Sequence, residues 1–230
     1  MLDPFGLAAW RTKNPTSGPT NPVHPGWPES TPSVTTVHGD VVRLRPLRRR
    51  DGALWCEMRL VDESWLRRVE PTTPHGWEAA HTKAAWKEYL QVLHAQSRRG
   101  ELIPLVIEVN GALCGQLTLG GIQHGTAASC WAGYWVASPM MGRSVATAAL
   151  ALGVDHAFQR VGVHRITATY LPDNPASKRV LSNNGFRDEG LLRGFLHIDG
   201  AWRDHHQSSL LADDFPESAV VRLRARGRLL

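Results

Sequence analysis

The sequence has little cysteine and no long apolar run. Its three cysteines, Cys56, Cys114 and Cys130, are an odd number and show no CxxC spacing. They indicate reduced thiols, because disulfide frameworks and zinc sites need paired cysteines at regular spacings. No stretch approaches the roughly 18 apolar residues of a membrane span. The N-terminal stretch MLDPFGLAAWRTKNP also lacks the basic and apolar regions of a secretory signal. We therefore expect a cytoplasmic protein without membrane contact.

The excess of positive charge is modest and local. The chain has 26 Lys and Arg against 21 Asp and Glu, a formal charge of +5. Such a balance favours an anionic cofactor or surface but does not by itself indicate nucleic-acid binding. Two arginine clusters, in segments 43–50 and 222–228, carry much of the excess. Their simplest interpretation is solvated surface, and docking on a ribosome is the alternative.

Three regions differ in composition. Residues 1–36 are rich in Pro, Thr, Ser and Gly and predict an extended N-terminal arm. Residues 37–214 carry regular apolar patterns and are long enough for one domain with its own core. Residues 215–230 form an Arg-rich tail.

The apolar patterns predict an α+β fold with a largely antiparallel sheet and one β-α-β crossover. Predicted strands are 37–45, 103–109, 112–121, 129–136, 164–171, 189–197 and 201–211, and predicted helices are 51–60, 77–98, 145–159 and 174–183. Asn110-Gly111 and Asp199-Gly200 are hairpin turns. The long helix 77–98 is expected to bury Ala80, Ala84, Tyr89, Val92 and Leu93.

The loop between the third strand of the meander and the next helix has the character of a phosphate site. Backbone N–H groups at a helix N-terminus favour a pyrophosphate, helped by the helix dipole. Gly142 allows close approach, Ser144 and Ala146 are small, and Arg143 adds positive charge. The alternative is an ordinary strand-to-helix turn, which is often rich in small residues.

One strand later, the segment Asn174–Phe186 predicts a well-capped helix. Asn174 is a good N-cap, Pro175 suits the first turn, and Gly185 suits the position after the last turn. A capped surface helix explains each residue. It does not explain why this helix follows a candidate phosphate loop.

Together, the two motifs resemble the acetyl-CoA-binding core of the GNAT N-acetyltransferases. The loop Met141-Gly142-Arg143-Ser144-Val145-Ala146 follows the family pattern Gln/Arg-x-x-Gly-x-Gly/Ala, with Met141 replacing Gln or Arg and Ser144 replacing Gly. Segments 43–51, 64–72 and 190–205 resemble the RimJ/RimL branch, which acetylates the N-terminal amines of ribosomal proteins. The resemblance covers about 37–214 and implies the GNAT fold.

The resemblance implies acetyl-CoA as cofactor and direct attack of a neutral amine on the thioester. The implied cofactor-binding residues are Trp135, Val136, Met141, Gly142, Arg143, Ser144, Val145, Ala146, Asn174, Ser177 and Lys178. The backbone N–H of Val136 is expected to bind the thioester oxygen, and Ser177 to assist the leaving thiolate. Glu70 is expected to hold the amine or to pass its proton, with Glu108 and His38 as weaker candidates.

Other chemistries are less favoured. Cys130 has no histidine near it in the chain to activate it as a nucleophile. The adjacent His205 and His206 point to opposite faces of a strand, so no metal site is predicted.

The acceptor remains open between a protein N-terminus and a small amine, for which Glu63, Glu70 and Glu101 are the candidate acidic groups. A non-catalytic acyl-CoA-binding protein is a third possibility, because Met141 and Ser144 depart from the family pattern. A monomer and a homodimer are equally compatible with the sequence.

Overall fold

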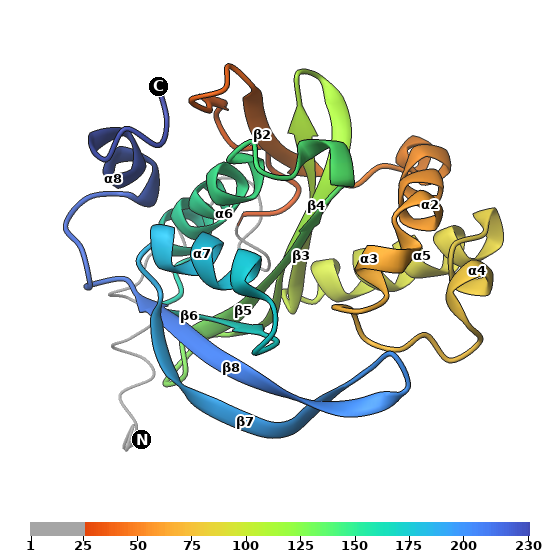
Figure 1. Cartoon of the computed structure of the whole chain (residues 1–230). Helices are drawn as coiled ribbons and strands as arrows, with labels where there is room; N and C mark the ends of the chain where they lie inside the picture. The colour runs from red at the N-terminus through yellow and green to blue at the C-terminus, as the bar shows by residue number, and fades with distance from the viewer. Residues whose placement is uncertain (1–25) are drawn as a thin grey trace, which may run out of the picture.

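A computed structural model describes residues 26–230, built around an eight-stranded sheet in the order β1-β2-β3-β4-β5-β6-β8-β7 (Figure 1). The strands are β1 (Val34–Thr35), β2 (Val41–Pro46), β3 (Leu102–Val109), β4 (Ala112–Gln123), β5 (Ser129–Val136), β6 (Arg165–Tyr170), β7 (Arg187–Ile198) and β8 (Ala201–Leu211). All neighbours are antiparallel except β5 and β6. The predicted α+β architecture with one crossover is confirmed.

Helices cover both faces of the sheet, with α2–α5 on one side and α6–α8 on the other (Figure 1). The helices are α2 (Gly52–Val61), α3 (Glu63–Leu66), α4 (Trp77–Ala80), α5 (Lys83–Arg98), α6 (Val145–His156), α7 (Pro175–Asn183) and α8 (Ala219–Ala225), with short helical turns η1 (Arg49–Asp51) and η2 (Ser138–Met140) and a π-helical segment η3 (Ala157–Val161) that continues α6. β3 is buried along its whole length, so its alternate side chains serve two cores. No helix within residues 26–230 is long and apolar enough to span a membrane.

The two central strands diverge. The parallel pairing of β5 with β6 is limited to Ser129–Trp131 opposite Arg165–Thr167. Beyond that point β5 remains paired with β4 as far as Val136, whereas β6 remains paired with β8. One edge of the second half of β5 is therefore left without a strand neighbour, and a gap opens in the middle of the sheet.

The predicted helix 77–98 is wrong as a single element, because it breaks into α4 and α5 at His81-Thr82. The Thr82 hydroxyl accepts a hydrogen bond from the Ala85 N–H at 3.1 Å and caps α5. The predicted buried face is wrong in part. α5 buries Trp86, Leu90 and Leu93, whereas Val92 is 56% exposed.

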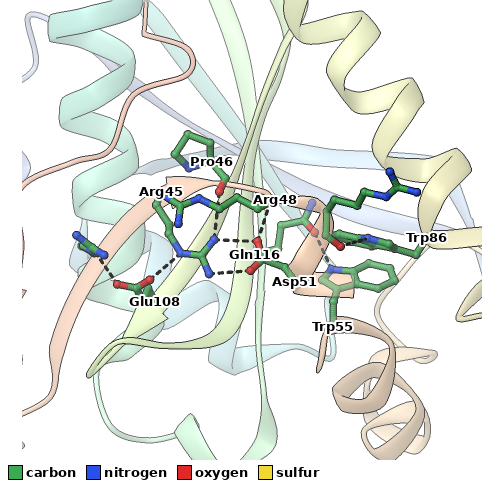
Figure 2. A network of polar contacts seen from close by, with 10 residues as sticks. Arg45, Pro46, Arg48, Asp51, Trp55, Trp86, Glu108 and Gln116 are labelled. Atoms are coloured by element: carbon green, nitrogen blue, oxygen red, sulfur yellow. Dashed lines mark hydrogen bonds and ion pairs between the residues drawn. The ribbon is translucent and has the colours of Figure 1, made fainter. Parts of the chain in front are cut away.

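The first arginine cluster is not simply solvated surface. Arg45 is buried, with its guanidinium paired to Asp51 at 2.8 Å and to Glu108 at 2.6 Å (Figure 2). Asp51 also accepts the Arg48 N–H, which ties the start of α2 to the sheet. Arg48, Arg49 and Arg50 do remain exposed. The buried part of this network positions α2, which forms one wall of the site described below.

The C-terminal segment packs against the start of the domain. Leu229 forms an antiparallel bridge with Thr36, and the Leu230 N–H donates to the Thr35 carbonyl at 2.9 Å. α8 lies against α6, where the Asp155 carboxylate accepts the N–H groups of Ala219 and Val220. The Arg-rich segment 215–230 is thus ordered on the fold. Residues 1–25 of the predicted N-terminal arm lie outside the described residues.

Candidate active site

A cavity of about 1380 Å³ opens where β5 and β6 diverge. Its walls come from both layers of helices as well as from the two strands. Ten of the residues predicted for the site line it: Glu70, Trp135, Val136, Met141, Gly142, Ser144, Val145, Ala146, Asn174 and Ser177. Arg143 and Lys178 are not among its lining residues. The fold thus brings together segments that lie more than 100 residues apart in the chain.

The loop before α6 presents backbone donors to this cavity. Gly142 and Ser144 both adopt the left-handed conformation, with φ of 73° and 63°. α6 has no side-chain cap, and its first intrahelical bond runs from the Ala148 N–H to the Ser144 carbonyl. The N–H groups of Val145, Ala146 and Thr147 therefore have no partner within the helix. Donors of this kind, at the positive end of a helix, suit a phosphate group.

Arg143 is turned away from the cavity. Its guanidinium forms two hydrogen bonds with the buried Asp40 carboxylate, at 2.8 and 2.9 Å. These bonds hold the pKa of Asp40 below its usual range. The pair ties the loop to the turn before β2. The positive charge predicted for the phosphate loop is thus already neutralised by Asp40.

The conformation of Ser144 predicts an effect on stability. A left-handed non-glycine residue costs about 1–2 kcal/mol, partly offset by the extra freedom that glycine has in the unfolded chain. We expect Ser144→Gly to raise the free energy of unfolding by about 0.5 kcal/mol, measured by urea denaturation. Ser182→Gly in α7 is a control of opposite sign, because glycine weakens an ordinary helical position. A less stable Ser144→Gly variant would contradict the assigned strain.

Ser177 lies beside a tyrosine that the sequence did not single out. The Tyr134 hydroxyl is 3.1 Å from the Ser177 Oγ, and both line the cavity. Burial raises the pKa of Tyr134 above its ordinary value, so the phenol stays protonated. Asn174 caps α7 by accepting the Ser177 N–H at 3.1 Å. The period-two alternation of the 129–136 strand could have placed Tyr134 on the face toward α7.

Glu70 is held by an arginine that the sequence analysis also missed. The Arg59 guanidinium binds both oxygens of Glu70, one of them at 2.9 Å. It also stacks on the rings of Trp55, Trp77 and Trp135, with its carbon 4.7, 5.0 and 5.2 Å from the ring centroids. Glu70 therefore faces the cavity as one half of an ion pair. The i, i+4 spacing of Trp55 and Arg59 was the available sequence signal.

His81 completes this cluster. Its Nε2 accepts the Arg59 Nε–H at 2.7 Å, so its Nδ1–H donates to the Trp77 carbonyl at 2.5 Å. Burial and the neighbouring Arg59 lower the pKa of His81 to about 4. The ring is therefore neutral near pH 7, which leaves Nε2 free to act as an acceptor.

The weaker candidates lie elsewhere. Glu108 is buried in the Arg43 and Arg45 ion pairs and does not line the cavity. His38 is exposed on the turn before β2, also outside the lining. Cys130 is 4% exposed, and burial raises its pKa to about 12, which disfavours a thiolate nucleophile. Residues 26–230 contain no cluster of three or more side chains able to hold a metal ion.

Comparison with known proteins gives concordant matches. A model of the acetyltransferase (GNAT) domain family matches residues 42–187. A probable N-acetyltransferase of Bacillus subtilis, YjcK, is 36% identical over 102 residues, which are 44% of this chain and 56% of that protein. The ribosomal protein uS5-alanine N-acetyltransferase of Escherichia coli is 30% identical over 103 residues, 45% of this chain and 53% of that protein. The chain thus spans about half the length of these curated relatives.

A solved structure matches far more of the chain. Mycobacterium smegmatis RimJ in complex with CoA-disulfide superimposes with a TM-score of 0.87 at 47% identity, covering 90% of this chain and 98% of that one. The family model covers more than half of the chain and includes both motifs of the cavity, the loop 141–146 and the segment 174–186. On this evidence the chain belongs to the family of GNAT-domain acetyltransferases.

Proposed function

We propose that the protein is an acetyl-CoA-dependent N-acetyltransferase that acts on the N-terminal amine of a protein. We further propose that this acceptor is a ribosomal protein. The observation that carries this proposal is the match to M. smegmatis RimJ, at 47% identity over nearly the whole of both chains. The E. coli relative named as a ribosomal protein uS5-alanine N-acetyltransferase supports the same acceptor class. Such a reaction belongs in the cytoplasm.

The cavity fits coenzyme A at three points. The N–H groups that begin α6 offer donors to its diphosphate. The unpaired edge of β5 offers backbone groups to the pantetheine amides, in the manner of an added strand. The cavity itself is large enough for an extended ligand. When bound, acetyl-CoA supplies an activated acetyl group as a thioester.

The residues at the divergence of β5 and β6 then have distinct tasks. The Val136 N–H is the donor we assign to the thioester oxygen, where negative charge develops as the amine attacks. The hydroxyl pair of Tyr134 and Ser177 supplies a proton to the departing sulfur. Glu70, held in place by Arg59, accepts a hydrogen bond from the incoming amine and orients it. An α-amine has a pKa near 8 and loses its proton to water readily.

The charges around the cavity favour a peptide over a polycationic small amine. Among the described residues that line it, the only carboxylates are Glu70 and Glu88. Arg59 neutralises Glu70. Glu63 and Glu101, the other acidic candidates, do not line the cavity and lie next to Arg67 and Arg99. A polyamine or aminoglycoside would find little negative charge here, whereas a single N-terminal amine needs only one acceptor.

The test is acetyl transfer to peptides with Ala or Ser at the N-terminus, including the N-terminal sequence of this organism's uS5, followed by thiol release and mass spectrometry. We expect one acetyl group on the α-amine and none on lysine side chains. Spermine and an aminoglycoside are the competing acceptors, and an N-acetylated peptide is the blank. Turnover of the small amines but of no peptide would overturn the proposed acceptor. Absence of turnover with every acceptor would overturn the enzyme assignment.

Three exposed arginines precede α2 and are candidates for binding the surface on which the acceptor protein is carried. We propose that Arg48, Arg49 and Arg50 face the acidic surface of a ribosome or ribosomal precursor. Their exposure and their position at the start of α2, next to the cavity wall, support this role.

A further inference from the structure

The phosphate end of the cavity lacks the cation that its own loop is expected to supply. Met141 stands where the family pattern has Gln or Arg. Arg143, the only basic residue in the loop, is bound to Asp40 and does not line the cavity. A ligand with several phosphate charges would therefore meet backbone N–H groups here without a counter-charge from the loop.

Besides Arg59, which is paired with Glu70, two arginines from outside the loop line the cavity. One is Arg179 in α7, and the other is Arg228 in the C-terminal segment. Both are exposed, and neither forms a side-chain hydrogen bond or an ion pair with any residue in the described range 26–230. Arg228 lies outside the region 42–187 that the family model matches. Arg228 therefore belongs to the C-terminal segment that the family model does not describe.

The backbone holds Arg228 in place from both sides. On one side, α8 ends in a Schellman motif: Gly227 has φ of 63°, and the N–H groups of Gly227 and Arg228 donate to the carbonyls of Arg224 and Leu223, each at 2.9 Å. On the other side, Leu229 is 4% exposed and bridges to Thr36. A long side chain on such a fixed backbone loses less freedom on binding than one on a loose tail.

The same contacts place Arg228 near the phosphate loop. Leu229 pairs with Thr36, and Thr36 accepts the Asp40 N–H in the turn that precedes β2. Asp40 in turn binds Arg143, the neighbour of Ser144 at the start of α6. The C-terminal segment, this turn and the loop thus form one connected group of contacts at the rim of the cavity.

We propose that Arg228 binds a phosphate group of coenzyme A and replaces the charge that Met141 and Arg143 do not provide. The inference rests on the proposed function, because it assigns a residue to the cofactor of that reaction. An arginine guanidinium matches the geometry of phosphate oxygens and forms charge-assisted hydrogen bonds with them. The group bound is either the diphosphate or the 3′-phosphate of the nucleotide.

Calorimetric titration of the full chain with coenzyme A tests the proposal. We expect Arg228→Ala to raise Kd about tenfold, as for the loss of one charged hydrogen bond at a partly exposed site. Arg228→Lys should retain part of the affinity. Arg226→Ala is the matched control, since Arg226 is exposed nearby but does not line the cavity. The Tm of each variant without ligand should equal that of the unmodified protein, because both side chains lie in solvent.

Titration with 3′-dephospho-coenzyme A distinguishes the two phosphate sources. A loss of affinity in Arg228→Ala that disappears with this ligand assigns Arg228 to the 3′-phosphate, and a loss that persists assigns it to the diphosphate. An unchanged Kd for coenzyme A in Arg228→Ala would overturn the inference alone. If the unmodified protein did not bind coenzyme A, the proposed function would fail and this inference with it.

Discussion

Replacement of Tyr134 by Phe is expected to lower kcat about a hundredfold, the lower end of the range for general acid catalysis. The reason is the pairing of its hydroxyl with Ser177 at 3.1 Å inside the cavity. Burial keeps the phenol protonated, so it is a donor throughout the working pH range. Kd for coenzyme A should change by less than about threefold, since the variant keeps the ring and its packing. Stopped assays of thiol release and calorimetry measure the two quantities.

Ser177→Ala and the double variant sharpen this assignment. If the two hydroxyls act as one proton-donating unit, the double variant should be no slower than Tyr134→Phe alone, because effects within a unit are not additive. Tyr170→Phe is the control, since its hydroxyl donates to Asp188 at 2.8 Å and not to Ser177. Full turnover in Tyr134→Phe would leave Ser177 as the sole donor. Full turnover in both single variants would remove the pair from the mechanism.

Replacement of Arg59 by Ala is expected to destabilise the fold by about 3 kcal/mol, the usual cost of removing one partner from a buried ion pair. The Arg59 side chain is only 7% exposed, against 21% for Glu70. Its removal leaves the Glu70 carboxylate and the His81 Nε2 without their donors. It also removes the cation from between the rings of Trp55, Trp77 and Trp135. Urea denaturation gives the change in the free energy of unfolding.

Two further variants separate the cost of leaving a buried charge unpaired from the cost of removing any arginine ion pair. Arg67→Ala removes an ion pair with Asp199 whose arginine is 58% exposed, and it should cost much less stability than Arg59→Ala, because solvent screens an exposed pair. Glu70→Gln in the Arg59→Ala background should recover part of the lost stability, because no unpaired carboxylate then remains in the cavity. If Arg59→Ala lowered the free energy of unfolding by less than about 1 kcal/mol, water would be replacing the lost ion pair, and the expected cost of a buried pair would be contradicted.

The order of strands and helices was accessible from the sequence because it depends on local patterns. Alternating apolar residues predicted most of the strands, and Asn110-Gly111 and Asp199-Gly200 adopt the positive φ angles that their hairpin turns require. Asn174 and Pro175 begin α7 as predicted, because capping involves only neighbouring residues. The same motifs were sufficient to indicate the family.

The wrong predictions concern contacts between distant segments. Helix 77–98 has a continuous helical pattern, but its break at His81 coincides with the contact that His81 makes with Arg59. The first arginine cluster looked like surface, yet Arg45 meets Glu108 across two strands, 63 residues away. Residue type and spacing carry no information about such partners.

The sequence by itself determined most of the elements, their order and the two motifs of the cofactor cavity, because each depends on residues close together in the chain. Only the tertiary structure decided how the charges and hydroxyls of the site are distributed. It sets Tyr134 beside Ser177, 43 residues apart, and joins Arg143 to Asp40, 103 residues apart. Arg228 reaches the cavity for the same reason. Hydrogen bonds and ion pairs act over a few ångströms of space, so their partners are set by the packing of the sheet and helices.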